Sequence, residues 1–309
     1  MVMKSLFYFL EKKQSNSILC IIGPTGCGKT QLSLDIANQY NGEIINADSK
    51  QLYKDIPLTS GAITKEEMNN IPHHLFSFVS SKKIMSVAEH RELAEHKITE
   101  IYSRKKLPIL VGGTALFILS LIENYQFPNA YDPELRKKLE EKTDSELWEQ
   151  LQALDSIESE KIPKSNKRRI IRALEIILLS GEKKSAVTTG LPKYNFLLLH
   201  PNIQSREILY EKINTRMEYL WNHGIKSESK SLSVQNIDQK HPAALAIGIP
   251  EAFALLSNTI TEEQAIIKTQ QKARNYAKRQ LTWWRKRDDI VYCDADSFSI
   301  EKIKDSKSL

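Results

Sequence analysis

The segment ILCIIGPTGCGKT, residues 18–30, constrains the fold more than any other part of the chain. An apolar run typical of a buried strand leads directly into the P-loop pattern G-x-x-x-x-G-K-[ST], and helix-compatible residues follow it. Backbone N–H groups of such a loop converge on phosphate oxygens at a helix N-terminus, and the lysine adds positive charge. The sequence therefore predicts a site for a diphosphate or triphosphate. Its residues are Gly23, Pro24, Thr25, Gly26, Cys27, Gly28, Lys29 and Thr30.

Two further strand ends are expected to reach this site. The run EIINADS, residues 43–49, ends near Asp48, and LPILV, residues 107–111, is followed by a Gly-Gly-Thr sequence whose threonine is Thr114. Ligands of open α/β sheets bind outside the carboxyl ends of the strands. Asp48 is therefore a candidate base for an acceptor substrate, and Thr114 a candidate donor to a leaving-group oxygen. The non-catalytic alternatives are a helix cap at Asp48 and a simple turn at the two glycines.

The Gly-Gly-Thr sequence also indicates which reactions are less suited to the site. An ordinary P-loop ATPase or GTPase has an acidic residue at the end of such a strand, where it organises Mg²⁺. This chain has none there. We expect Mg²⁺ to be bound through the hydroxyl of Thr30. The three cysteines have no spacing typical of a zinc site.

The composition is that of an ordinary globular protein, with 41% hydrophobic and 27% charged residues. A length of 309 residues suggests one large domain or two. The net charge of +6 favours an anionic macromolecule as a partner. No stretch approaches the length of a membrane-spanning helix, and the N-terminal residues lack a cleavage site. We expect a cytoplasmic protein without membrane contact.

Strand and helix signals are unevenly distributed along the chain. From Asp132 onward, helix starts follow one another without an intervening strand until FLLLH, residues 196–200. We therefore expect an α/β fold: a P-loop NTPase-like core with a parallel sheet flanked by helices, plus an inserted all-helical domain. The expected core comprises residues 1–124 and 193–309, and the expected insertion comprises residues 125–192.

Two segments are strongly basic. Residues 164–172 gather lysines and arginines at a helix start, while Ile170, Ile171 and Leu178 are spaced to face inward. Residues 268–287 carry eight lysines and arginines interleaved with aromatic residues, which is typical of nucleic-acid binding. The alternative is that both charge runs are solvated helix faces. We expect the tryptophans of the second segment to lie in the core.

The chain resembles the bacterial type of tRNA dimethylallyltransferase (tRNA isopentenyltransferase), a family that prenylates the N6 amine of the adenosine next to the anticodon. The P-loop alone is unspecific, whereas Gly-Gly-Thr after a strand combined with a C-terminal AKRQ-x-TW pattern is highly specific. The matching pieces lie in family order over nearly the whole chain. They are GPTGCGKT (23–30), DSKQLY (48–53), IPHHL (71–75), LPILVGGTALF (107–117), RRIIRALE (168–175), INTRM (213–217) with Gly224 and Glu228, and YAKRQLTWWR (276–285).

The resemblance implies a role for several of these residues. The P-loop would hold the diphosphate of dimethylallyl diphosphate with Mg²⁺, and Lys29 would neutralise this leaving group. Asp48 would accept the proton of the adenine N6 amine, Thr114 would bond the bridging oxygen, and Arg216 would clamp the diphosphate. The partner would be the anticodon stem-loop of tRNA, bound by a monomer. The residues implied near the RNA are Asp48, Ser49, Lys50, Gln51, Arg136, Arg168, Arg169, Ile170, Ile171, Arg172, Lys278 and Arg279.

The chain departs from the family pattern in four places. Ser60–Thr64 replaces G-T-A-K-P, Ser77 replaces an acid, His90 replaces a phenylalanine, and residues 248–251 replace G-Y-[KR]-E. These differences affect RNA contacts and rate rather than the proposed chemistry. Two other functions stay open: a P-loop kinase, which the missing strand-end acid disfavours, and an RNA-binding protein without catalysis.

Overall fold

The computed structural model describes residues 9, 16–128, 132–186 and 190–293. The chain forms two compact units, one of residues 1–122 together with 193–309 and one of residues 123–192. Within the described ranges, no helix combines the length and the apolar character needed to cross a membrane.

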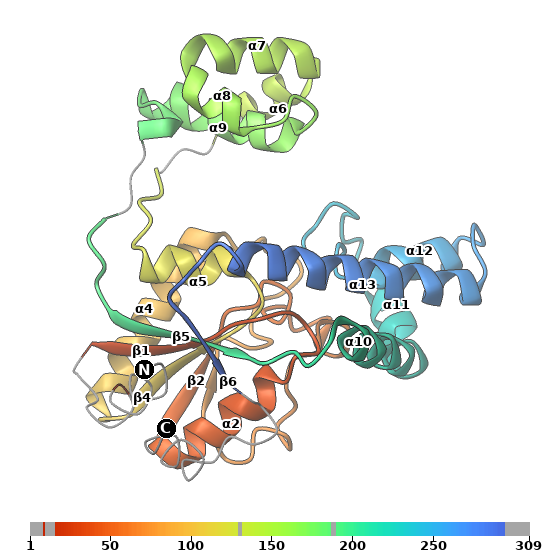
Figure 1. Ribbon diagram of the computed structural model, residues 1–309. Helices are drawn as coiled ribbons and strands as arrows, with labels where there is room; N and C mark the ends of the chain where they lie inside the picture. The colour runs from red at the N-terminus through yellow and green to blue at the C-terminus, as the bar shows by residue number, and fades with distance from the viewer. Residues whose placement is uncertain (1–8, 10–15, 129–131, 187–189, 294–309) are drawn as a thin grey trace. The chain divides into compact units, whose positions relative to one another are not determined.

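The first unit is built on a six-stranded sheet in which every paired strand is parallel, as the sequence predicts. Its outer strands are short and its four longest strands are buried for most of their length, which explains why they read as apolar runs without alternation. Figure 1 shows the sheet in the lower part of the ribbon. In spatial order the strands are β3 (His73–His74), β2 (Gly42–Asn46), β4 (Leu107–Val111), β1 (Ser17–Ile21), β5 (Asn195–Pro201) and β6 (Ile290–Cys293).

The register brings three strand ends to one level. Ile21 of β1 pairs with Val111 of β4, and Val111 pairs with Asn46 of β2. The segments that follow these three strands therefore leave the sheet side by side at its carboxyl edge. They are the P-loop, the segment with Asp48, and the Gly-Gly-Thr sequence.

Helices cover both faces of the sheet. Helix α2 (Lys29–Tyr40) packs Leu32 and Ile36 against the strands on one face, and α5 (Ala115–Ile122) lies on the other (Figure 1). Helix α4 (Val87–Ser103) begins with a capping box, in which the Ser86 hydroxyl accepts from the N–H of Glu89. Such a box satisfies two backbone donors that the helix itself cannot pair.

A second core of this unit is helical. It joins α10 (Arg206–Leu220) to α13 (Glu262–Trp284), whose buried alanines allow close packing. A π-helical turn, Trp221–Ile225, links α10 to α11 (Lys226–Val234), and Trp221 of this turn is fully buried. The other helices are α3 (Pro57–Ser60) and α12 (Ile249–Leu256).

The second unit is entirely helical in its described residues. Its helices are α6 (Pro133–Glu140), α7 (Asp144–Leu154), α8 (Ser156–Lys161) and α9 (Lys167–Ser180), with the 3₁₀ turn Lys184–Ala186. The inward spacing predicted for Ile170 and Ile171 is confirmed, because both lie in the core of this unit. The inward placement predicted for Leu178 is wrong, since this side chain is 43% exposed close to the end of α9.

Candidate active site

The P-loop connects β1 to α2 as its pattern predicts. Helix α2 starts at Lys29, directly after Gly28, which has a φ of 91°. The amine of Lys29 donates to the carbonyl oxygens of Gly23 and Pro24, at 3.0 and 2.7 Å, so it lies over its own loop. Cys27 instead packs into the helical core beside α10, and burial raises the pKa of its thiol. The hydrogen bonds of Lys29 and the burial of Cys27 thus both stabilise the conformation of the loop.

Asp48 is held in place by hydrogen bonds with residues just before and after it in the chain. The amide of the buried Asn46 side chain accepts from the N–H of Asp48 and donates to the carbonyl oxygen of Asp48, at 2.8 and 3.1 Å. The Asp48 carboxylate accepts from the N–H of Lys50 at 2.9 Å. His90 donates from Nε2 to the carbonyl oxygen of Asn46 at 2.8 Å. The carboxylate therefore keeps acceptor capacity for a further partner.

Thr114 lies behind Asp48 and makes its contacts within the protein. Its hydroxyl accepts from the N–H of Ser49 at 3.0 Å and donates to the hydroxyl of Ser49 at 3.3 Å. Tyr276 of α13 lies close to Thr114 and Gln280, and burial raises the pKa of the Tyr276 phenol. A neutral phenol stays a donor at this strand end.

Arg216 reaches the same region from α10. Its guanidinium lies over the backbone of Gly61, where an added Cβ would stand 1.8 Å from Nη2. Burial lowers the pKa of Arg216, and the nearby charge of Asp48 opposes this effect. A desolvated guanidinium beside a carboxylate is suited to binding an anion with several oxygens.

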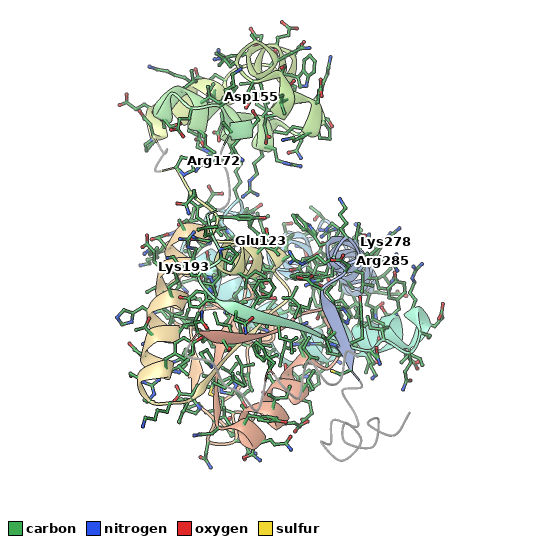
Figure 2. The ribbon with its side chains drawn as sticks, turned by 60° about the vertical axis from the view of Figure 1, so that its left-hand side comes forward. Glu123, Asp155, Arg172, Lys193, Lys278 and Arg285 are labelled. Atoms are coloured by element: carbon green, nitrogen blue, oxygen red, sulfur yellow. The ribbon has the colours of Figure 1, made fainter. Side chains whose placement is uncertain are left out.

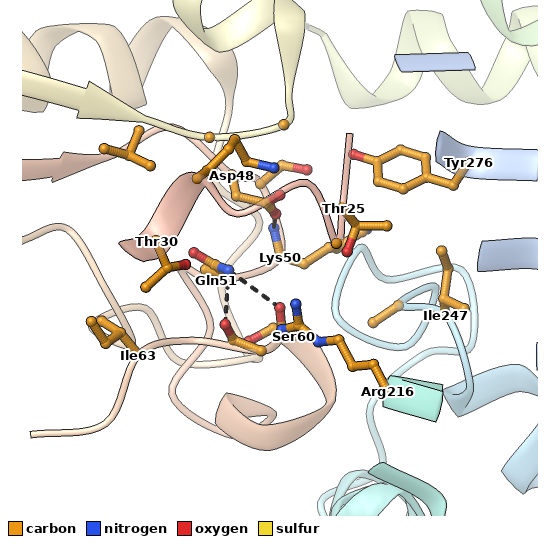
Figure 3. Close-up of a pocket in the computed structure, with 18 of the residues that line it drawn as sticks. Thr25, Thr30, Asp48, Lys50, Gln51, Ser60, Ile63, Arg216, Ile247 and Tyr276 are labelled. Atoms are coloured by element: carbon orange, nitrogen blue, oxygen red, sulfur yellow. Dashed lines mark hydrogen bonds between the residues drawn. The ribbon is translucent and has the colours of Figure 1, made fainter. Parts of the chain in front are cut away.

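These groups surround one cavity of about 420 Å³, a volume typical of small-molecule sites. Figure 3 shows Thr30, Asp48, Arg216 and Tyr276 reaching it from separate elements. Thr114 does not line the cavity itself. Ser49, which is hydrogen-bonded to Thr114, and the nearby Tyr276 both do. The lining residues from the predicted site are Thr25, Gly26, Gly28, Lys29, Thr30, Asp48, Ser49, Lys50, Gln51, Arg216 and Arg279.

Two of the residues expected near RNA already have partners beside this cavity. Lys50 donates from Nζ to the carbonyl oxygen of Pro242 at 2.6 Å, and Gln51 donates from Nε2 to that of Gly61 at 2.9 Å (Figure 3). Lys278 is exposed on α13 (Figure 2), and the guanidinium of Arg279 lies 5.5 Å from the ring centroid of Tyr276.

The second unit divides its expected RNA residues into two groups. Arg168 and Arg169 are exposed at the start of α9. Arg136 and Arg172 instead bind Glu175, which is fully buried, with N–O distances of 3.1 and 3.2 Å. The expectation that Ile170 and Ile171 contact RNA is corrected by the structure. Their side chains are 0% and 2% exposed, because the spacing that predicts a core face also removes them from the surface. 

The expectation about the tryptophans of α13 is half right. Trp284 is 2% exposed and lies in the core, as predicted, whereas Trp283 is 53% exposed. Adjacent positions on a helix point about 100° apart, so both could not face the same core.

Three residues at or beside the cavity have no role in the sequence prediction. Asn46 supports Asp48, while Tyr276 and Gln280 of α13 reach the strand ends. Gln280 and Tyr276 stand in the C-terminal motif, which was the available signal. Their partners are far away in sequence, with Gln280 and Thr25 separated by 255 positions, so no local pattern could pair them.

The donor set fits a hydrated divalent cation rather than a protein-bound metal cluster. Across the described residues, no group of three or more His, Cys, Asp or Glu side chains could hold a metal ion. Thr30 and Asp48 nevertheless offer oxygen atoms in the cavity. Mg²⁺ commonly uses few protein oxygens and relies on substrate phosphates and water.

The fold and the cavity define a P-loop α/β protein in which a phosphate-binding loop, a carboxylate and a guanidinium face one cavity. The profile of the IPP transferase family matches residues 51–287. This chain belongs to that family.

Curated relatives agree with this assignment. The tRNA dimethylallyltransferase of Limosilactobacillus reuteri (strain DSM 20016) is 37% identical over 287 residues, which cover 90% of this chain and 93% of the relative. That of Anoxybacillus flavithermus (strain DSM 21510 / WK1) is 39% identical over 281 residues, covering 90% of each chain.

Solved structures are similar over most of the chain. The full-length tRNA isopentenylpyrophosphate transferase of Bacillus halodurans has a TM-score of 0.69 at 34% identity, with 95% of each chain covered. A eukaryotic dimethylallyltransferase acting on tRNA has a TM-score of 0.78 at 28% identity, covering 91% of this chain and 74% of that one.

Proposed function

We propose that this protein transfers a dimethylallyl group from dimethylallyl diphosphate to the N6 amine of adenosine 37 in tRNAs that read codons beginning with U. The C1–O bond of the donor breaks, the N6–C1 bond forms, and diphosphate leaves with the electron pair of the broken bond. The amine loses one proton. The observation that carries the proposal is the arrangement of the P-loop, Asp48 and Arg216 around one cavity, in a chain of the IPP transferase family.

The residues of the cavity suit the two ends of this reaction. Lys29, the loop N–H groups and Arg216 stabilise the negative charge that develops on the diphosphate, which is the main catalytic need of the reaction. Asp48 accepts the proton of the attacking amine as a general base. Thr114 donates to the bridging oxygen, for which its hydroxyl proton turns away from the hydroxyl of Ser49.

Mg²⁺ is part of the proposal as a charge-neutralising ion. Thr30 and the diphosphate oxygens would hold it, and Asp48 offers a further oxygen in the same cavity. When bound, it supplies electrostatic stabilisation of the leaving group.

The proposed partner is tRNA, whose anticodon loop holds the target adenine stacked on neighbouring bases. An enzyme acting on such a base must extrude it into its pocket. Lys278 and Arg279 of α13, and Arg168 and Arg169 of α9, are basic side chains suited to phosphate contacts. We propose that the protein acts as a monomer in the cytoplasm, where tRNA is the available substrate.

The test is incubation of purified protein with Mg²⁺, labelled dimethylallyl diphosphate and a transcribed anticodon stem-loop. A matched stem-loop with guanosine at the target position is the control RNA. We expect label in the adenosine-containing RNA alone. A parallel reaction with labelled ATP examines the kinase alternative, and ATP turnover without prenyl transfer would overturn the proposal.

A further inference from the structure

Gln280 of α13 is a buried polar side chain to which the proposed chemistry gives no role. It is 4% exposed, and both ends of its amide are paired with backbone. Oε1 accepts from the N–H of Thr25 in the P-loop at 3.0 Å, and Nε2 donates to the carbonyl oxygen of Gly113 at 2.9 Å. One side chain thus joins the loop that holds phosphate to the strand end that carries Thr114.

The Gly-Gly-Thr sequence is shaped around this amide. A Cβ on Gly113 would stand 2.0 Å from Nε2 of Gln280, so glycine is required for the contact. Tyr276, one turn earlier on α13, lies close to both Gln280 and Thr114. Gly113 is therefore more than a simple turn residue, because it makes room for the Gln280 side chain.

The same turns of α13 also carry the basic side chains proposed to bind RNA. Lys278 and Arg279 are exposed next to the buried Gln280, and Arg279 lines the cavity. A displacement of this helix by a ligand on its exposed face would move the amide that holds Thr25 and Gly113. Hydrogen bonds weaken steeply when their distance or angle departs from the optimum, so a small shift of α13 would change how Thr25 and Gly113 are held.

We propose that Gln280 is a positioning residue that couples RNA binding on α13 to diphosphate binding in the P-loop. The inference rests on the proposed function, since it takes tRNA and a diphosphate as the two ligands. Each ligand favours the α13 position in which Thr25 and Gly113 are correctly held, so each increases the affinity for the other. Such coupling is reciprocal and typically amounts to about 5- to 150-fold in affinity.

The experiment measures binding without prenyl transfer. Titration calorimetry gives the dissociation constant of inorganic diphosphate with Mg²⁺, in the absence and the presence of saturating anticodon stem-loop RNA. For the natural protein we expect the RNA to tighten diphosphate binding by about 5-fold or more. In Gln280→Met, which keeps the side-chain volume but removes both hydrogen bonds, the ratio should fall to near one.

The matched control is Gln271→Met, the same change at an exposed position of the same helix. It should keep the ratio of the natural protein. Under saturating substrates, Gln280→Met should also lower kcat for prenyl transfer by about 10-fold or more, with a smaller change in KM, because both ligands still bind but are less well positioned. A role in stability alone would lower the unfolding temperature without changing the coupling ratio.

A second pair of variants keeps the inference testable if Gln280→Met folds poorly. Gly113→Ala should lose the coupling because the new methyl displaces the amide, and Gly113→Ala combined with Gln280→Ala should be no worse than Gln280→Ala alone. Strict additivity of the two losses would contradict the contact. Wild-type coupling in Gln280→Met, or independent binding of the two ligands to the natural protein, overturns the inference alone. Failure of the natural protein to bind the stem-loop overturns the proposed function as well.

Discussion

Two carboxylates of this molecule are held in opposite ways. Glu175 of the second unit is fully buried and accepts from the guanidinium groups of Arg136 and Arg172. Asp48 in the first unit is half-buried and accepts from the backbone N–H of Lys50. Among the described residues, no ion pair within 4.0 Å includes Asp48, although it lines a cavity with Arg216. One carboxylate is neutralised by the protein, and the other is positioned by it.

The difference separates stability from chemistry. A fully buried carboxylate that accepts from two partly exposed guanidinium groups serves the fold, because its own charge needs these partners away from water. A carboxylate held through backbone donors beside a cavity keeps lone pairs for a substrate. The family resemblance places Arg136 of α6 and Arg172 of α9 near the RNA, and its RRIIRALE piece ends on Glu175 without indicating that this acid binds both arginines.

The largest effect is expected from removing the positioned carboxylate. Asp48→Ala should lower prenyl transfer by about 10²-fold or more, because proton removal from the amine loses its base, and Thr114→Ala should do the same by removing a donor to the leaving group. RNA affinity should stay nearly unchanged. Single-turnover rates and filter binding of the stem-loop measure the two quantities. Near-normal turnover in either variant would exclude the role assigned to that residue.

The neutralised carboxylate should matter for stability instead. Glu175→Gln removes the buried negative charge that Arg136 and Arg172 both contact, and we expect a loss of about 2 kcal/mol in the free energy of unfolding of the second unit, because the acid is buried while both arginines are partly exposed. Chemical denaturation followed by circular dichroism measures this loss. Glu140→Gln removes the other, exposed carboxylate partner of Arg136 and should cost less than about 1 kcal/mol. Equal losses in the two variants would contradict a larger contribution of the buried Glu175 than of the exposed Glu140.

The approach of Arg216 to the cavity can be disturbed without touching either carboxylate. Gly61→Ala would place a methyl group 1.8 Å from Nη2 of Arg216 and so move the guanidinium. We expect kcat/KM for dimethylallyl diphosphate to fall by about 10- to 100-fold, as a displaced anion clamp does. The control is Gly181→Ala, at a similar left-handed φ of 73° but with no atom within 4 Å of the new methyl. If both variants behave alike, backbone strain rather than Arg216 is responsible.

The sequence predicts the local parts of this site better than its long-range contacts. The P-loop between a strand and a helix and the buried strands depend on residues within a few positions, and both are confirmed. The bond from Gln280 to Thr25 and the pairing of Glu175 with Arg136 depend on residues brought together only by the fold. The exposed Trp283 illustrates the same limit, since helix phase near a helix end is set by packing.

The smallest expected effect concerns the scaffold beneath Asp48. His90 is 1% exposed, stacks on Phe117 with ring centroids 4.1 Å apart, and donates to the carbonyl oxygen of Asn46. Burial lowers the pKa of His90 to about 4, from an ordinary value of 6.5. The unfolded chain therefore binds a proton more readily than the native one between these values. Stability is complete above pH 6.5 and is lost as the pH falls toward 4.

His90→Phe should remove this part of the pH dependence. Phenylalanine keeps the stacking surface but cannot be protonated, so the loss of unfolding free energy between pH 7 and pH 5.5 should be about 1 kcal/mol smaller than in the natural protein. His200, whose pKa burial also lowers to about 4, titrates in the same window in both proteins and cancels in the comparison. Denaturation midpoints at the two pH values measure the difference. Parallel pH profiles would mean that folding leaves the pKa of His90 unchanged. The buried Nδ1 of His90, which has no hydrogen-bond partner among the described residues, supports a neutral ring.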